Sequence, residues 1–117
     1  MGFGLVRVTK NPLGPAIFRD VQNVPAPTSP ADGDQVRPGQ VRLMARNVAD
    51  SAARYMFEIV GKGNVRETSQ PIVAGRGQTA WTPQLRLQSG EQYTWRVWAV
   101  NGEWRGQPAS TVFRVAQ

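Results

Sequence analysis

The chain has 117 residues, of which 40% are apolar and 19% are charged, with twelve glycines and nine prolines. This length suits one domain with one hydrophobic core, and the composition is that of a folded chain with many turns. The sequence contains neither cysteine nor histidine, which excludes disulfides, thiolate or imidazole metal sites and histidine-dependent catalytic relays. We therefore expect a non-enzymatic protein without a cofactor or a metal.

The net charge is +6, and twelve of the fourteen basic residues are arginines, which favour planar contacts with carboxylates, phosphates and aromatic rings. The arginines are dispersed along the chain and form no basic tail, so the sequence disfavours a nucleic-acid partner. No apolar run reaches the roughly 20 residues that span a bilayer, and the N-terminus lacks the apolar stretch of a signal peptide. We expect no membrane insertion, and the compartment stays open: a virion surface or an extracellular assembly fits.

The first 24 residues differ from the rest of the chain. Two short apolar stretches, residues 3–9 and 16–21, flank a turn that contains two prolines and a glycine, a pattern that indicates a β-hairpin or an extended arm. The segment is too apolar for a free tail and too short for a core of its own. We expect it to dock on its own domain or on a neighbouring subunit. Its candidate contact residues are Phe3, Leu5, Ile17 and Phe18.

From residue 25 onward the pattern is that of strands. Three prolines within residues 25–30 exclude a helix there. Polar and apolar residues then alternate with a period of two, and glycine-containing turns separate the alternating segments. Seven short strands without a helical period predict an all-β sandwich or barrel. The expected strands cover residues 41–46, 54–59, 65–69, 71–74, 78–81, 93–100 and 111–115.

Residues 87–102, LQSGEQYTWRVWAVNG, resemble the tyrosine corner and the following strand of bacterial or phage fibronectin type III domains, which are immunoglobulin-like. The resemblance covers residues 25–117. It implies a seven-stranded antiparallel β-sandwich in which the Tyr93 hydroxyl bonds to the backbone near Leu87. Ala45 stands where the family usually has a core tryptophan, so Trp81 or Trp95 must supply that volume. The expected core is Leu43, Tyr55, Phe57, Trp81, Leu87, Tyr93, Trp95, Val97 and Phe113.

One face of the predicted sandwich mixes aromatic and basic side chains. If Tyr93, Trp95 and Val97 point into the core, Arg96 and Trp98 must point outward, beside the outward residues of the neighbouring strands. Exposed tryptophan and arginine are enriched at the centres of protein interfaces. Trp104 is interpreted as a lid on the end of the core, and Asp32-Gly33-Asp34 as a turn and not a calcium site. The candidate partner-binding residues of this face are Arg54, Arg96, Trp98 and Arg114.

Three hypotheses for function follow. The sequence favours a structural or assembly module that docks on a larger particle or fibre, because the apolar arm and the Arg/Trp face both need a covering. Domains resembling this one serve as virion accessory parts, such as capsid decoration or tail proteins. The first alternative is a spacer or carbohydrate-binding module of an extracellular bacterial protein, with Trp98 and Trp104 as sugar platforms. The second is a basic β-sandwich that binds nucleic acid.

Overall fold

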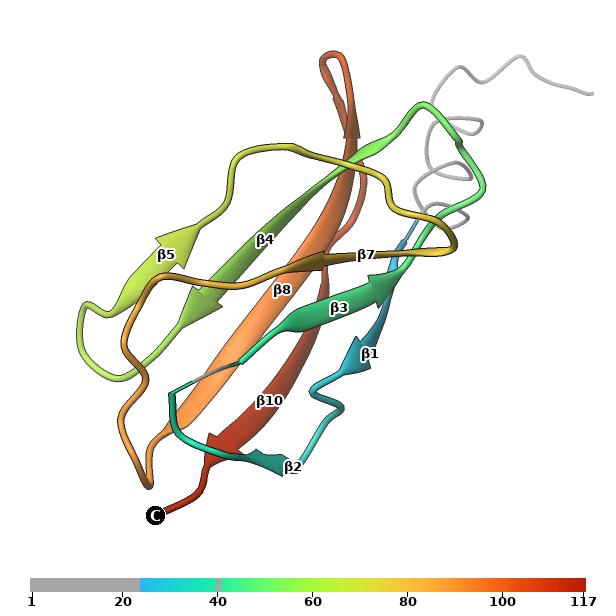
Figure 1. Ribbon diagram of the computed structural model, residues 1–117. Coiled ribbons are helices and arrows are strands. Elements are labelled where there is room, and N and C mark those ends of the chain that lie inside the picture. Colours follow the sequence, from blue (N-terminus) through green and yellow to red (C-terminus); the bar gives the residue numbers. More distant parts are fainter. Residues whose placement is uncertain (1–23, 40) are drawn as a thin grey trace, which may run out of the picture.

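The structure, a computed structural model, describes residues 24–39 and 41–117, and this part of the chain consists of strands and loops (Figure 1). The prediction of an all-β chain is therefore confirmed for the described residues. None of them forms a helix long and apolar enough to cross a bilayer. The arm residues Phe3, Leu5, Ile17 and Phe18 lie outside the described part. The strands are β1 (Ala26–Ser29), β2 (Asp34–Val36), β3 (Leu43–Arg46), β4 (Arg54–Val60), β5 (Arg66–Thr68), β6 (Ile72–Val73), β7 (Gln78–Trp81), β8 (Gln92–Asn101), β9 (Trp104–Arg105) and β10 (Ala109–Val115).

These strands form two sheets that face each other (Figure 1). The smaller sheet has the order β1-β3-β7, and the larger has the order β2-β10-β8-β4-β5, with β6 pairing with β4 and β9 pairing with β8. The sequence predicted seven antiparallel strands, but β2 pairs with β10 in parallel, with Asp34 opposite Phe113. The reason is that the segment containing β1 and β2 changes sheets between Ser29 and Asp34. Its first half pairs with β3, and its second half runs alongside β10.

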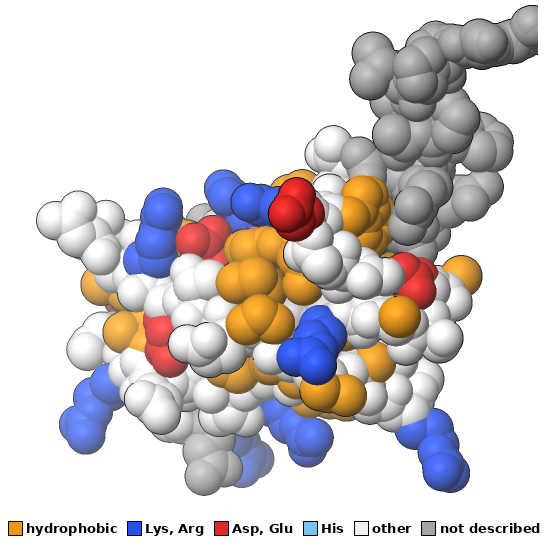
Figure 2. Space-filling view, turned by 90° about the horizontal axis from the view of Figure 1, so that it is seen from above, with side chains coloured by type: hydrophobic (Ala, Val, Ile, Leu, Met, Phe, Trp, Pro, Cys, Tyr) orange, Lys and Arg blue, Asp and Glu red, His pale blue; other side chains and the backbone are white. Residues whose placement is uncertain are grey.

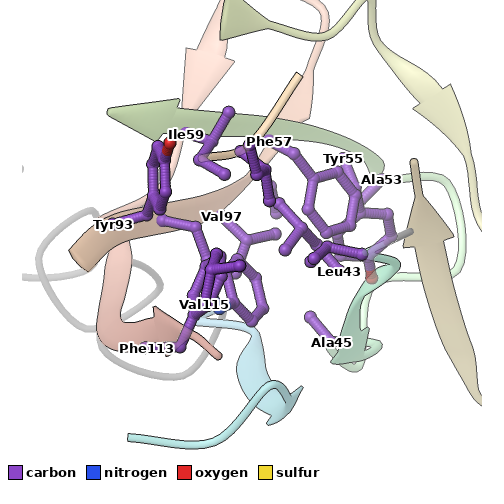
Figure 3. Packing of buried hydrophobic residues seen from close by; sticks show 14 residues of the cluster. Leu43, Ala45, Ala53, Tyr55, Phe57, Ile59, Tyr93, Val97, Phe113 and Val115 are labelled. Atoms are coloured by element: carbon purple, nitrogen blue, oxygen red, sulfur yellow. The ribbon is translucent and has the colours of Figure 1, made fainter. Parts of the chain in front are cut away.

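Alternate side chains of the long strands fill the space between the sheets, as the period of two requires. Figure 3 shows Leu43 and Ala45 of β3 pointing into the same interior as Tyr55, Phe57 and Ile59 of β4. Of the nine residues expected in the core, Trp81 is half-buried and packs against this cluster. The other eight are buried: Leu43, Tyr55, Phe57, Leu87, Tyr93, Trp95, Val97 and Phe113.

The aromatic volume of the core comes from β4, β7, β8 and β10. Trp95 has no exposed surface, and its ring stacks on Phe57 with a centroid distance of 6.1 Å. Phe57 stacks at 6.1 Å on Trp81 as well. The Trp95 indole N–H donates to the carbonyl oxygen of Pro30 at 3.2 Å, so its polar atom is satisfied inside the core. Ala45 is fully buried in the same cluster, and β3 therefore contributes no aromatic ring.

Two tyrosines tie loops to the sandwich through their hydroxyl groups. The Tyr93 hydroxyl accepts a hydrogen bond from the Gln88 backbone N–H at 2.9 Å, next to the buried Leu87. The Tyr55 hydroxyl accepts one from the Val48 N–H at 2.8 Å. The Tyr93 ring lies so close to Gly61 that an added Cβ there would be 2.7 Å from the ring. Both rings therefore pack in the core while their oxygen atoms hold backbone at its margin.

The stacked position of Trp95 predicts a large stability loss on truncation. Trp95→Ala should lower the free energy of unfolding by about 3–5 kcal/mol, because it removes a fully buried indole and leaves a cavity. Denaturant unfolding followed by circular dichroism measures this loss. The matched control is Val73→Ala, since Val73 is 68% exposed and its truncation should change stability by less than about 0.5 kcal/mol. A Trp95→Ala variant as stable as this control would contradict the packing described.

The buried phenol of Tyr55 predicts a loss of stability at alkaline pH. Burial raises the pKa of Tyr55 above its ordinary value of 10.0, the hydrogen bond from Val48 opposes this, and the Asp50 carboxylate adds to it. The folded state therefore keeps the phenol proton at a pH where the unfolded chain has lost it, so the unfolding free energy falls as the pH rises above about 10. In Tyr55→Phe this alkaline fall should be shallower, after a loss of about 1 kcal/mol at neutral pH from the unpaired Val48 N–H. Urea unfolding between pH 7 and pH 11 tests both effects. Identical alkaline slopes for the two proteins would refute the first, and equal stability at pH 7 would refute the second.

Candidate functional site

The larger sheet has one face in the core and one face directed outward. Side chains on the outward side lie in cross-strand pairs, with Met56 opposite Trp98 and Glu58 opposite Arg96. Such directly opposite side chains are about 5 Å apart at their Cβ atoms and interact. We call this surface the outer face. Its members are Arg54, Met56 and Glu58 of β4, Arg66 of β5, Thr94, Arg96, Trp98 and Val100 of β8, Arg105 of β9, and Ser110, Val112 and Arg114 of β10.

Glu58 carries the negative charge of the outer face. Its side chain is only 12% exposed, and its carboxylate lies 3.7 Å from the Arg96 guanidinium and 3.8 Å from that of Arg66. The Thr68 hydroxyl also donates to this carboxylate at 3.2 Å. Two arginines thus share one carboxylate, at distances too long for strong bidentate pairing. Both arginine side chains stay about half exposed or more, at 49% for Arg96 and 63% for Arg66.

Trp98 lies on the outer face but is buried, with 6% of its surface exposed. The hairpin that joins β8 to β9 turns at Gly102, whose φ is +61°, and places Arg105 opposite Val100. From there the Arg105 guanidinium covers the Trp98 ring, with its central carbon 4.4 Å from the ring centroid. The prediction that Trp98 is an exposed contact residue is therefore wrong. The Asn101-Gly102 turn signal could have located the cover, since a tight hairpin brings Arg105 diagonally onto Trp98.

Arg54 and Arg114 of the outer face form no ion pair with any carboxylate of the described residues. Arg54 is exposed, and no other described residue forms a hydrogen bond or an ion pair with it. Arg114 donates to two neutral acceptors, the Gly90 carbonyl oxygen at 3.0 Å and the Gln92 side-chain oxygen at 3.3 Å. The structure thus brings Arg54, Arg96 and Arg114 onto one surface, as the alternation pattern predicted, with Arg105 and Arg66 beside them.

Three other described carboxylates, those of Asp32, Asp34 and Glu67, accept hydrogen bonds from backbone N–H groups. Glu67 accepts the backbone N–H groups of two residues after β7, at 2.8 and 3.1 Å. Asp34 accepts the Ala31 N–H at 2.8 Å within its own turn, whereas Asp32 accepts the Val112 N–H at 3.1 Å and so joins this turn to β10. Residues 24–39 and 41–117 contain no group of three or more potential metal-ligating side chains. Because Asp32, Asp34 and Glu67 bond to backbone N–H groups, Glu58 is the described carboxylate that pairs with arginines of the outer face.

One end of the sandwich has a depression of about 410 Å³ next to the outer face, bounded by Arg54, Asn101 and Pro71. Trp104 lies half-buried near this end and packs against the core cluster. Viewed from this end, apolar side chains gather in the middle and lysines and arginines project along both long borders (Figure 2). A guanidinium beside an amide can bind a carboxylate. Its described lining residues offer neither a nucleophile nor a base for catalysis; they are Ala52, Arg54, Pro71, Val100, Asn101 and Gly102.

No protein family model matches the chain, and no curated protein or solved structure is significantly similar to it. Function must therefore be argued from the residues themselves. The feature that the structure adds to the sequence is that Arg105 covers Trp98 on the arginine-rich outer face.

Because Arg105 covers the Trp98 ring, removing the Arg105 side chain should expose this ring to solvent. Arg105→Ala should increase acrylamide quenching of tryptophan fluorescence, because it uncovers the Trp98 ring, and should lower stability by about 0.5–1 kcal/mol through loss of the cation–π contact. The same substitution in a Trp98→Phe background serves as the control for the other three tryptophans. Quenching that rises equally in both backgrounds would show that Arg105 does not shield Trp98.

Proposed function

We propose that this chain is a non-enzymatic assembly module that docks on a larger particle or fibre, as a capsid decoration or tail protein of a virion does. The observation that carries the proposal is the outer face, where five arginines share one sheet surface with a single described carboxylate, Glu58, which pairs with Arg66 and Arg96. An uncompensated basic surface of this kind steers and orients a partner with complementary charge. The partner surface that fits it is acidic.

We further propose that the fold is of the fibronectin type III kind, within the immunoglobulin-like sandwiches. Three features support this assignment. The sheet orders are β1-β3-β7 and β10-β8-β4-β5, the Tyr93 hydroxyl accepts a hydrogen bond from Gln88, and Leu87 is buried beside it. A rigid sandwich of this kind suits docking, because its sheet faces present side chains in fixed positions.

The contact on the outer face would be made by guanidinium groups. Arg54 and Arg114 have no acidic partner among the described residues, and Arg96 is half exposed beside Glu58. Guanidinium groups bind carboxylates in a planar, two-pronged manner and are less hydrated than ammonium groups, so they suit protein interfaces. Residues 1–24 add apolar contacts in this proposal, through Phe3, Leu5, Ile17 and Phe18.

The outer face makes the two alternative functions, carbohydrate binding and nucleic-acid binding, less suitable for different reasons. Carbohydrate binding was predicted to use Trp98 and Trp104, and a sugar stacks only on an exposed ring. Trp98 is covered by Arg105, so it is not available for this contact. A nucleic-acid role is favoured by the same arginines that favour an acidic protein. Single-stranded nucleic acid also requires exposed aromatic rings for its bases, and the outer face offers none among the described residues. An acidic protein surface therefore fits better.

The proposal predicts which changes abolish docking. The intact chain should co-sediment with particles from its source, and the triple variant Arg54→Ser/Arg96→Ser/Arg114→Ser should bind at least about tenfold more weakly, since each lost charged contact at an interface costs binding energy. A chain lacking residues 1–24 should also bind more weakly. The matched control is Arg37→Ser/Lys62→Ser/Arg86→Ser, which removes the same charge from outside the outer face and should bind like the intact chain.

Two results would contradict the proposal. One is an intact chain that neither self-associates in sedimentation velocity nor binds the particles. The other is tight binding to a DNA duplex or to single-stranded DNA that falls steeply with salt, which would identify a nucleic-acid partner instead. Equal loss of binding in both triple variants would show that only net charge matters and would remove the role of the outer face.

A further inference from the structure

The strands that end the two sheet orders, β1 and β7 in the smaller sheet and β2 and β5 in the larger, are unequally protected against pairing with another strand. β1 contains Pro27, which lacks a backbone N–H; β2 begins at Asp34; and β5 carries Arg66 and Glu67. Proline and charged residues are the usual protection of a sheet edge. β7, Gln78–Trp81, has neither proline nor charge. Among the described residues, β7 is therefore the edge most open to an added strand.

β7 also has unsatisfied pairing capacity. It lies at the end of the order β1-β3-β7 and pairs only with β3 among the described strands, with Leu43 opposite Trp81 and Arg46 opposite Gln78. In an antiparallel ladder the residues of an edge strand alternate in direction, so every second residue points its N–H and C=O away from the neighbour. In β7 these residues are Gln78 and Ala80, because the Asn47 N–H bonds to the Gly77 carbonyl oxygen. Gly75 lies against the Gln78 carbonyl oxygen, so an added backbone segment would form its hydrogen bonds with Ala80.

A depression of about 360 Å³ adjoins this edge. Its apolar surface comes from Met44 of β3, Ala80 of β7, and Ile72 and Val73 of β6. Val73 is the most exposed large apolar side chain of the described residues, at 68%. The small Ala80 side chain leaves room above the strand. An apolar side chain of an added segment would be sheltered in this depression.

The charge around the depression is positive. Arg42 and Arg76 line it. Arg42 precedes Leu43, which pairs with the last residue of β7, whereas Arg76 stands two residues before the first residue of β7. The two arginines are therefore associated with opposite ends of the strand. No acidic side chain lines the depression among the described residues, so the complementary ligand carries a carboxylate at each end.

From this arrangement we infer that the β7 edge binds an extended peptide segment of a partner protein as an added strand. Alternate side chains of a strand point to the same side, so a carboxylate, an apolar side chain and a second carboxylate at positions one, three and five span about 13 Å. This segment places its apolar side chain over Ala80 and its carboxylates at Arg42 and Arg76. Polypeptide backbone is the ligand that matches a strand edge. The site lies on the smaller sheet, and the inference does not depend on the function proposed for the outer face.

The test uses the intact chain and the synthetic peptide acetyl-Asp-Thr-Val-Thr-Asp-amide as the probe. Titration followed by ¹⁵N–¹H NMR should shift the amide signals of Gln78–Trp81 and their neighbours. Ala80→Glu places a bulky negative side chain in the depression, and the double variant Arg42→Ser/Arg76→Ser removes the charge partners. Each should weaken binding by about tenfold or more, and well-dispersed NMR spectra show that both variants are folded.

Matched probes separate strand addition from general attraction. The peptide with lysine in place of both aspartates, and the peptide with its three central amides N-methylated, should leave the β7 signals unchanged. Arg54→Ser/Arg96→Ser, on the outer face, should bind the probe as the intact chain does. The inference is overturned by an absence of shifts at millimolar peptide, by shifts confined to the outer face, or by equal binding of the lysine or N-methylated peptide.

Discussion

Phe57 of β4 lies between two tryptophan rings, Trp81 of β7 and Trp95 of β8, at centroid distances of 6.1 Å to each. Because β7 belongs to the smaller sheet and β8 to the larger, this stack spans the interior and joins the two layers. The Trp95 indole also bonds to Pro30, where the chain passes from one sheet to the other. Offset aromatic contacts of this kind add to the free energy from buried apolar area. The positions of both candidate surfaces depend on this packing.

The acidic and basic side chains of the described residues have different roles: several carboxylates bind backbone N–H groups, whereas many arginines are exposed. The carboxylates of Asp32, Asp34 and Glu67 accept backbone N–H groups in turns and loops, and Glu58 is shared by two arginines. These bonds stabilise connections between strands, since a carboxylate that accepts backbone N–H groups satisfies donors that would otherwise be unpaired. Among the described arginines, Arg114 forms a comparable bond, because its guanidinium donates to the Gly90 carbonyl oxygen. The arginines of the outer face, and Arg42 and Arg76 beside the smaller sheet, therefore present positive charge to a partner.

The two candidate surfaces differ in the interaction that they offer. The outer face presents a finished sheet surface, with its ladders complete and its tryptophan covered by Arg105, so it can contribute side-chain contacts only. The β7 edge presents open backbone groups beside an apolar depression, so it can extend the sheet. A protein with both surfaces can hold one partner by charge and another by strand pairing, because the surfaces lie on different sheets.

The sequence by itself determined the element type, the in–out direction of the side chains and most of the core. The alternation over residues 93–100 places Trp95 and Val97 inside, because successive side chains of a strand point to opposite sides, and the motif around Leu87 and Tyr93 indicates the hydroxyl-to-backbone bond that Gln88 donates. Period alone assigns a side chain to a face but does not say what lies above that face. Only the tertiary structure decided that Arg105 buries Trp98, that Glu58 is shared by Arg66 and Arg96, and that β2 runs parallel to β10. These contacts join residues from separate strands, so they depend on register and sheet order, which are set by packing of the whole molecule.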